Sequence, residues 1–427
     1  MTLIDDYLKE QSSFSNKYGD RTIVLMQVGH FYECYGVDND IEKSNSANLY
    51  RLSDVLDIQL TRKNKNIKEN SRKNPLMIGV NIYSVDKYIQ MLLNNNYTTI
   101  LIEQVSDPPF VERKVTNIYS PGTNVQYNLK GETNNLMCIY VEKSKETMCI
   151  GISTIDLSTG KNVVYELFSK PDDKNYGLDE IFRFIQTYDP KEIIFIKKNI
   201  SITNEFLNNY LDLNQRVIHF KDAKDIRQDY YNLNYQTTLL EKIFRNTGML
   251  SIIEFLDLEN QHFGLLSYIL VLDFAYEHNS TIVEKISKPE LWVNNKHLSL
   301  TNNTINQLNL IDHNSQNNNC KYNSLYSVLN NASTSIGKRL LRERLLNPIL
   351  DEGLLNKRYD YIESMCDLNS PSYYKYYETH LMKILDIERL HRKMGLQMLQ
   401  PSDFAGIDFS YEHVKHILEI NSLNDLK

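Results

Sequence analysis

The sequence lacks several features that would assign it to a common class of protein. No apolar run approaches the roughly 20 residues of a membrane-spanning helix, and the N-terminus has no basic start followed by an apolar segment, as a secretory signal would have. The five cysteines are scattered, odd in number and never spaced Cys-x-x-Cys, and the ten histidines form no ligand-like cluster along the chain. We therefore expect an intracellular protein with reduced thiols and no metal site. It would work in an organelle, a virus-infected cell or a bacterial cytoplasm rather than outside the cell.

Tryptophan is almost absent, and positive charge is not in excess. The chain has one tryptophan but 29 tyrosines, and it is also rich in asparagine, lysine and isoleucine. These residues have A/T-heavy codons, so the tyrosines report an AT-rich source and do not by themselves indicate a base-stacking surface. The net charge is −7. Any affinity for nucleic acid must therefore come from local basic patches.

Residues 1–120 alternate between strand-like and helix-like segments, which is typical of an α/β domain. Short apolar, β-branched runs predict strands, and apolar residues at helical spacing after Ser84 predict a helix. The strands are expected at residues 22–28, 57–61, 76–80 and 97–102, and the helix at residues 85–93.

Residues 132–225 show a different order of elements. Three strand-like runs joined by two short turns predict an antiparallel meander, after which helix and strand alternate. The runs lie at residues 136–141, 148–156 and 161–168, and a helix near 178–187 and a strand at 192–196 follow them. This order predicts a second α/β domain, of the ribonuclease-H-like kind.

Residues 235–427 read as almost entirely helical. Apolar residues recur at i, i+3, i+4 and i+7 over residues 237–260, 262–278, 322–346 and 354–366. A last helix begins at Pro401, and its pattern still runs near Leu423. Because this all-α region stops without a completed domain, we expect the chain to be the N-terminal part of a longer, multidomain protein.

The most informative segment follows the first apolar run, Thr22–Val28. The run ends at Gly29, and we expect a short irregular turn that carries Phe31 and Glu33. An aromatic ring beside a carboxylate is unusual in a core, because burying an unpartnered acid costs several kcal/mol. The pair is explained if the ring enters a ligand and the acid touches a polar group just inside it.

This segment resembles the Phe-x-Glu motif of the MutS family of DNA mismatch-repair proteins, whose usual form is Gly-Asp-Phe-Tyr-Glu-Leu-Phe. His30 replaces the usual aspartate, and Asn81, Ile82 and Tyr83 replace an expected Pro-Tyr-His. Further similar segments follow in family order, at residues 56–61 (Leu-Asp-Ile-Gln-Leu-Thr), 77–80, 103–104, 111–115 (Val-Glu-Arg-Lys-Val), 121–123, 155–160 and 386–390 (Asp-Ile-Glu-Arg-Leu).

The resemblance implies a mismatch-binding domain over 1–120, a connector over 132–225 and an incomplete helical core and lever region over 235–427. Phe31 would act as a wedge that inserts beside a mispaired base, and Glu33 would hydrogen-bond the displaced base. The implied partners are double-stranded DNA with mismatches or small loops and a second family member in a dimer, with no membrane involved.

No catalytic site is apparent in this chain. The family's ATPase carries a Gly-x-x-x-x-Gly-Lys-Ser/Thr loop, which nothing here satisfies, since Gly337 and Lys338 are followed by Arg339 inside a predicted helix. The resemblance therefore places ATP and Mg²⁺ beyond Lys427.

A basic segment follows the expected reading head and is opposed only by Glu69. If this segment is a DNA-binding loop, it would contact phosphates, each of which adds to the salt dependence of binding. The alternative is an ordinary solvated surface loop without a ligand. Its members are Arg62, Lys63, Lys65, Lys68, Arg72 and Lys73.

Two other functions remain open at this stage. A DNA-junction scaffold of the same family would grip branched DNA without mismatch specificity, although such members tend to lack the wedge aromatic. A ribonuclease-H-like nuclease would use Asp156 with further carboxylates, for which Glu166, Asp172 and Asp173 are the nearest in sequence. The helical region also carries basic residues that are either surface charges or contacts with other domains or DNA, namely Lys338, Arg339, Arg342, Arg344, Arg392 and Lys393.

Overall fold

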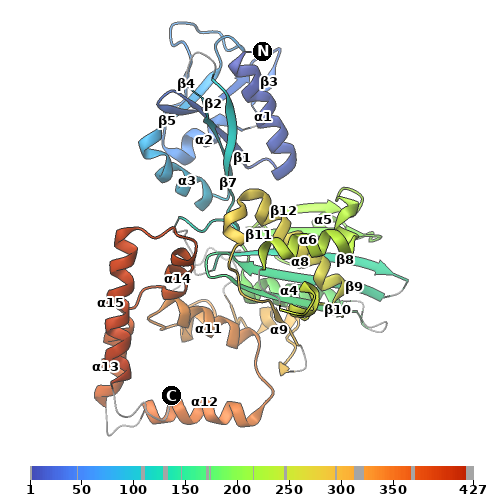
Figure 1. The fold of residues 1–427 in the computed structure, drawn as a ribbon, viewed down its shortest axis with the longest axis vertical. Helices are drawn as coiled ribbons and strands as arrows, with labels where there is room; N and C mark the ends of the chain where they lie inside the picture. The colour runs from blue at the N-terminus through green and yellow to red at the C-terminus, as the bar shows by residue number, and fades with distance from the viewer. Residues whose placement is uncertain are drawn as a thin grey trace.

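The computed structural model shows a mixed α/β region followed by a helical region (Figure 1), as the sequence predicts. It describes residues 2–419, except for residues 46, 107–110, 128–132, 146, 170–172, 174, 215, 245–247, 294–295, 312–321 and 367–370. Leu423 and Asp172 therefore lie outside the described residues. None of the helices in the described ranges is long and apolar enough to cross a membrane.

The first unit is a twisted sheet with strand order β4-β5-β2-β1-β6-β7, in which the short strand β3 pairs with β2. Helix α1 packs against β1 and β2, and its capping box at Thr2 and Asp5 satisfies amide groups of the first turn. The elements are α1 (Leu3–Tyr18), β1 (Thr22–Val28), β2 (Phe31–Asp38), β3 (Lys43–Ser44), α2 (Leu49–Leu56), β4 (Thr61–Arg62), β5 (Leu76–Asn81), the 3₁₀ helix η1 (Ile82–Ser84), α3 (Val85–Asn94), β6 (Thr98–Gln104) and β7 (Arg113–Tyr119).

Two predictions for this unit are wrong. The expected irregular turn is instead a two-residue hairpin loop, Gly29 and His30, with Gly29 at φ +60°, and Phe31 already begins strand β2. A glycine with positive φ at the first loop position suits the right-handed twist of the two flanking strands. The strand expected at 57–61 does not form over that range: Asp57 is the left-handed C-cap (φ +53°) of helix α2, residues 58–60 belong to no helix or strand, and the short strand β4 begins only at Thr61.

The second unit contains the predicted three-stranded meander, and its sheet has the strand order β12-β11-β8-β9-β10-β13. Strands β11 and β12 run parallel to β8, whereas β9 is antiparallel to both β8 and β10. At the far edge, β13 runs parallel to β10. The elements are β8 (Asn135–Ser144), β9 (Thr147–Asp156), β10 (Lys161–Phe168), α4 (Tyr176–Tyr188), β11 (Glu192–Lys198), α5 (Asn204–Tyr210), β12 (Val217–Asp222), η2 (Gln228–Tyr231), α6 (Leu233–Ile243), α7 (Ile252–Phe255), α8 (His262–His278), η3 (Ser280–Val283) and β13 (Glu290–Leu291).

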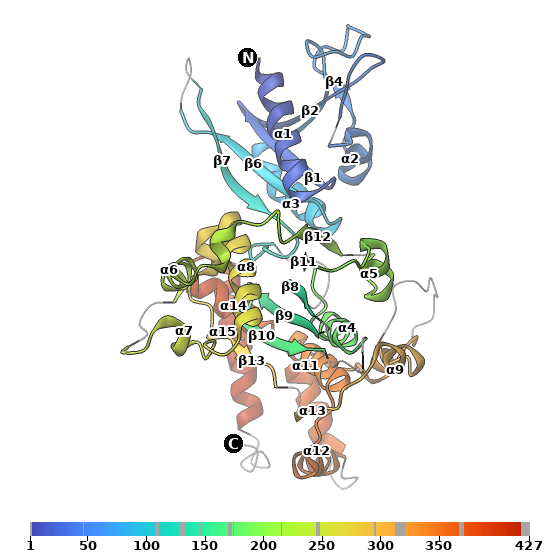
Figure 2. The same ribbon diagram turned by 90° about the vertical axis from the view of Figure 1, so that its right-hand side faces the viewer.

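Helix α8 lies on this sheet (Figure 2), so the second unit extends well past residue 225. A Cβ atom on Gly151 of β9 would lie 1.9 Å from the carbonyl oxygen of Phe263 at the start of α8, so only glycine permits this close approach. Strand β13 then joins the edge of the sheet beside β10. The predicted boundary between residues 225 and 235 is therefore wrong, and so is the single helix expected over 237–260, since α6 ends at Ile243.

The remaining helices follow the second unit (orange to red in Figure 1); α9 and α11 pack against its helix α4, and α13 and α15 lie side by side. The single helix expected over 322–346 is in fact two, because Thr334 caps a new helix by accepting a hydrogen bond from the amide of Gly337. The helices are α9 (Asn302–Gln307), α10 (Leu325–Leu329), α11 (Ser335–Leu346), α12 (Glu352–Met365), α13 (Pro371–Leu381), α14 (Ile387–Gly395) and α15 (Pro401–Leu418).

Candidate nucleic-acid interface

Phe31 lies at one end of the first sheet, as the first residue of β2. Its backbone pairs with Val28 on one side and with Asn81 on the other. The amide of Ile82 donates a hydrogen bond to the carbonyl of His30 (3.1 Å), which ties the hairpin loop to the corner after β5. The Phe31 side chain is 46% exposed. A large apolar ring is thus held in solvent by a well-connected backbone, as a wedge requires.

Glu33 follows two residues later and so lies on the same face of β2 as Phe31. Its carboxylate accepts a hydrogen bond from the hydroxyl of Tyr35, the next residue on that face. Burial, and then this bond to Glu33, raise the pKa of the Tyr35 hydroxyl, which therefore stays a donor. The Glu33 carboxylate therefore has a hydrogen-bond donor within the protein, which the sequence did not indicate.

Basic side chains reach this end of the sheet from β7. Arg113, the first residue of β7, pairs with Gln104 and donates from Nε to the carbonyl of Gln27 (3.1 Å), next to the β1–β2 loop. Lys114 is exposed and forms an ion pair with the exposed Glu112 (3.2 Å). Because exposed ion pairs are weak, the Lys114 ammonium group remains available to a phosphate. These two residues belong to the 111–115 segment. Their position at this end of the sheet depends on the pairing of β6 with β7, which sequence spacing does not reveal.

Tyr83 adds a second exposed aromatic ring near Phe31. It lies in η1, two residues after the pairing partner of Phe31, and is 90% exposed. Asn81 fixes the corner by accepting a hydrogen bond from the amide of Tyr83 (3.0 Å). The exposed aromatics of this unit therefore include two that gather where β2 begins and β5 ends.

The predicted basic segment lies at the other end of the same strands. On β5, Arg62 pairs opposite Leu76 whereas Phe31 pairs opposite Asn81, a separation of five residue steps or about 17 Å. The structure therefore does not bring this segment together with Phe31 and Glu33. Four of its members are exposed and form no salt bridge with other described residues, namely Lys63, Lys65, Lys68 and Lys73.

Arg72 differs from the rest of the basic segment because its charge is already used. Its guanidinium bonds Asp5 (2.8 Å) and Glu42 (2.8 Å). Hydrogen bonds from Thr2 and then from Arg72 lower the pKa of Asp5 to about 2. Arg72 thus connects the loop to α1 and is poorly placed to neutralise a phosphate.

Models of three successive domains match the chain: MutS domain I over residues 11–128, MutS domain II over 134–269 and MutS domain III over 303–427. The chain belongs to the MutS family. It is 33% identical over 454 aligned positions to the putative DNA mismatch repair protein mutS homolog L359 of Acanthamoeba polyphaga mimivirus, covering all of this chain and 40% of that protein. It is 29% identical to the DNA mismatch repair protein MutS of Caldanaerobacter subterraneus subsp. tengcongensis, covering 98% of this chain and 44% of that protein. The chain thus spans less than half the length of these relatives.

Asp156, the residue on which the nuclease hypothesis depends, lies in MutS domain II and is buried. Its Oδ1 accepts hydrogen bonds from the amide (2.9 Å) and the hydroxyl (2.5 Å) of Ser158, and burial raises the pKa of the carboxyl. Glu166 instead accepts from the first amides of α8, and Asp173 accepts from the amide of Tyr176. Among the described residues, no three His, Cys, Asp or Glu side chains are arranged to hold a metal ion. The described carboxylates therefore serve separate structural contacts, and we do not propose a nuclease.

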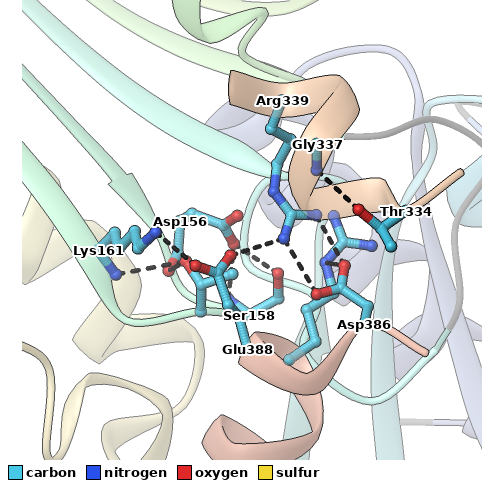
Figure 3. Close-up of polar contacts among 10 residues, drawn as sticks. Asp156, Ser158, Lys161, Thr334, Gly337, Arg339, Asp386 and Glu388 are labelled. Atoms are coloured by element: carbon cyan, nitrogen blue, oxygen red, sulfur yellow. Dashed lines mark hydrogen bonds and ion pairs between the residues drawn. The ribbon is translucent and has the colours of Figure 1, made fainter. Parts of the chain in front are cut away.

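A polar network joins MutS domains II and III (Figure 3). Arg339 of α11 donates to Asp386 (2.7 and 3.0 Å) and to Glu388 (2.7 Å). Lys161, at the start of β10, donates to the other oxygen of Glu388 (2.6 Å). The carboxylates at the start of α14 therefore bridge the second sheet and helix α11.

Arg392 of α14 makes a second connection, to β9–β10 and to the segment that follows α8. It is 6% exposed, and its guanidinium donates to the carbonyls of Leu157 (3.2 Å), Ile282 (2.6 Å) and Glu284 (2.6 Å). Burial lowers its pKa to about 10. Arg342 likewise donates to the carbonyl of Gln186 (3.0 Å). The structure thus places Arg339, Arg342 and Arg392 in domain contacts, whereas Arg344 is exposed.

Three histidines also come together, contrary to what their spacing in the sequence indicates. His380 of α13 and His413 of α15 lie with their Nδ1 atoms 2.9 Å apart, and the His416 ring centre is 5.2 Å from that of His380. This cluster is not arranged to hold a metal ion with other described residues. His380 lies more than 30 positions before the other two histidines, so sequence spacing did not connect it with them.

The network at Asp386 and Glu388 predicts a specific pH dependence. Burial alone would raise the pKa of both carboxyls, but hydrogen bonds from Arg339 to Asp386, and from Lys161 and Arg339 to Glu388, outweigh it and lower both. An acid with a lowered pKa stabilises the fold above its unfolded pKa of about 4, and this contribution is lost as the pH falls through the folded value. We expect the difference in melting temperature between wild type and Arg339→Met to be large at pH 7 and to shrink below about pH 4. Calorimetric melts of both proteins at each pH measure this difference. A difference that is the same at pH 7 and below pH 4 would contradict the role of Arg339 as the partner of these two carboxylates.

Proposed function

We propose that this chain recognises mismatched DNA in mismatch repair, with Phe31 as a wedge inserted from the minor groove. The observation that carries the proposal is the half-exposed Phe31 ring, fixed at the end of a hairpin beside Glu33. Wedge residues of this type kink DNA by roughly 20–90° and cost a few kcal/mol per unstacked step. A mispaired step has lost pairing energy already, so it yields more cheaply than normal duplex. Such a reader detects deformability and needs no fixed base sequence.

Glu33 would contact the displaced base in this proposal. A base rotated out of its pair exposes N–H groups, and a carboxylate accepts hydrogen bonds from them. Arg113 and Lys114 would supply positive charge at the same end of the sheet, where the phosphates flanking the kink would lie. Partner DNA with mismatches or small loops, and a dimer with a second family member, are part of the proposal.

The exposed lysines at the other end of the sheet would contact the DNA backbone away from the wedge. Each neutralised phosphate adds about 0.9 to the slope of log affinity against log salt concentration. We expect the double variant Lys65→Glu/Lys68→Glu to lower this slope by about two, and Arg72→Ala to leave it unchanged because Arg72 is paired with Asp5 and Glu42. Titrations at four salt concentrations measure both. Equal slopes in wild type and the double variant would place this loop away from DNA.

We also propose that domain II is a ribonuclease-H-like connector without catalysis. Support comes from its sheet, in which three antiparallel strands precede two strands that run parallel to the first and extend the sheet on its other side. ATP and Mg²⁺ would act elsewhere in the whole protein. The residues present do not fit a phosphate loop, because the amide of Gly337 already donates to Thr334 (3.1 Å) within helix α11.

Four DNA ligands of equal length test the proposed function: a matched duplex, a G·T mismatch, an unpaired-base loop and a four-way junction. We expect the mismatch and the loop to bind more tightly than the matched duplex. Preference for the four-way junction, with no difference between mismatch and matched duplex, would instead support the junction scaffold.

A further inference from the structure

We propose that Tyr35 is a positioning residue that fixes the Glu33 carboxylate for base contact. This inference rests on the proposed function of Phe31 and Glu33. The hydroxyl of Tyr35 donates to Oε2 of Glu33, and no hydrogen bond from another described residue reaches Oε1. One carboxylate oxygen is therefore held by the protein while the other is left for a ligand.

The donor is rigid because the Tyr35 ring belongs to the core. Tyr35 is 1% exposed, and its ring meets the Tyr7 ring edge-on, with centres 5.3 Å apart and planes at 85°. Tyr7 is itself fixed by a hydrogen bond from its hydroxyl to the carbonyl of Val24 (3.1 Å). Phe31, Glu33 and Tyr35 occupy every second position of β2, so their side chains lie on the same face of the sheet. The order along that face is wedge, acid, then buried anchor.

The Tyr35 hydroxyl is a departure from the family motif that the segment resembles. The usual form ends in phenylalanine at this position, Gly-Asp-Phe-Tyr-Glu-Leu-Phe, whereas this chain has Tyr35. A phenylalanine would fill the same space but could not donate a hydrogen bond.

Fixing the carboxylate before binding should strengthen mismatch recognition. A free glutamate side chain samples several rotamers and loses that freedom when it binds, whereas an anchored one has lost most of it already. Functional side chains held by a supporting shell reach the required geometry more often. Tyr35 would thus act through Glu33, without touching DNA itself.

A double-mutant cycle tests this inference. We expect Tyr35→Phe to lower the ratio of mismatch to matched affinity about three- to tenfold, the range for one immobilised side chain. In a Glu33→Ala background, Tyr35→Phe should have no further effect on the ratio, because the group that it positions is gone. Glu33→Asp, which keeps the charge but shortens the reach to Tyr35, should reduce the ratio as Tyr35→Phe does. Fluorescence anisotropy with G·T and matched duplexes measures every variant.

The matched control is Tyr165→Phe, which removes a buried hydroxyl that donates to a different glutamate, Glu180 (3.1 Å), in domain II. It should lower the melting temperature and leave the affinity ratio unchanged. An unchanged or higher ratio in Tyr35→Phe would overturn the inference, as would an equal loss in the Glu33→Ala background. A wild-type protein without any mismatch preference would instead overturn the proposed function itself.

Discussion

Phe31→Ala should abolish the preference for mismatched over matched duplex while leaving weak, salt-sensitive binding. The ring is the group that would fill the gap in an unstacked step, and a methyl group cannot. Unstacking costs a few kcal/mol, and each 1.4 kcal/mol is a factor of ten in affinity. We therefore expect wild type to bind the mismatched duplex one to two orders of magnitude more tightly than the matched duplex. In the variant, the ratio of these two affinities should be near one. Anisotropy titrations with G·T and matched duplexes measure both ratios.

Phe168→Ala is the matched control for this result. Phe168 is also a phenylalanine at a strand end and is 51% exposed, close to the 46% of Phe31, but it lies in domain II at the end of β10. Its replacement should leave the mismatch preference intact. If Phe31→Ala keeps the full preference, Phe31 is not the wedge.

The second large effect is expected at the junction of domains II and III. Arg392→Met should lower the free energy of unfolding by about 2 kcal/mol or more, because the buried carbonyls of Leu157 and Ile282 lose their donor and each unsatisfied buried group costs roughly 1–3 kcal/mol. The carbonyl of Glu284 is only partly buried and adds less. Methionine keeps much of the apolar stem, so the loss reports the guanidinium contacts with Leu157, Ile282 and Glu284. Calorimetry should show the transition that involves domain III at a lower temperature.

Arg344→Met is the control for the junction, since Arg344 is exposed in the neighbouring helix α11. Surface substitutions of this kind usually change stability by less than 0.5 kcal/mol. Equal melting of Arg392→Met and wild type would show that the carbonyls find other partners, and the domain contact would then not depend on this arginine.

The sequence predicts those elements best that are buried on both faces. The three strands of the meander are rich in apolar and β-branched residues and mostly buried, and the structure has them as β8, β9 and β10. Strand β2 was missed because Glu33 interrupts its apolar pattern, and it forms only through pairing with β1 and β5. Helix α8 was predicted as a helix but assigned to the wrong unit, because periodicity does not tell which surface covers an apolar helix.

The candidate site shows the same division between local and long-range information. Phe31 and Glu33 stand out from the motif alone, and the structure places them on one face of one strand. The Tyr35 hydroxyl and the separation of the basic segment from Phe31 depend on side-chain direction and strand register. Arg339 and Arg392 look like solvated helix charges in the sequence, because the partners of Arg392 lie more than 100 positions away.

The most direct test of the wedge is an experimental structure of this chain bound to a duplex with one G·T mismatch. The account predicts the Phe31 ring stacked against a base of the mispaired step, the duplex kinked there, and the Glu33 carboxylate within hydrogen-bond distance of the displaced base. A complex in which the ring contacts no base and the mismatch remains stacked would contradict it.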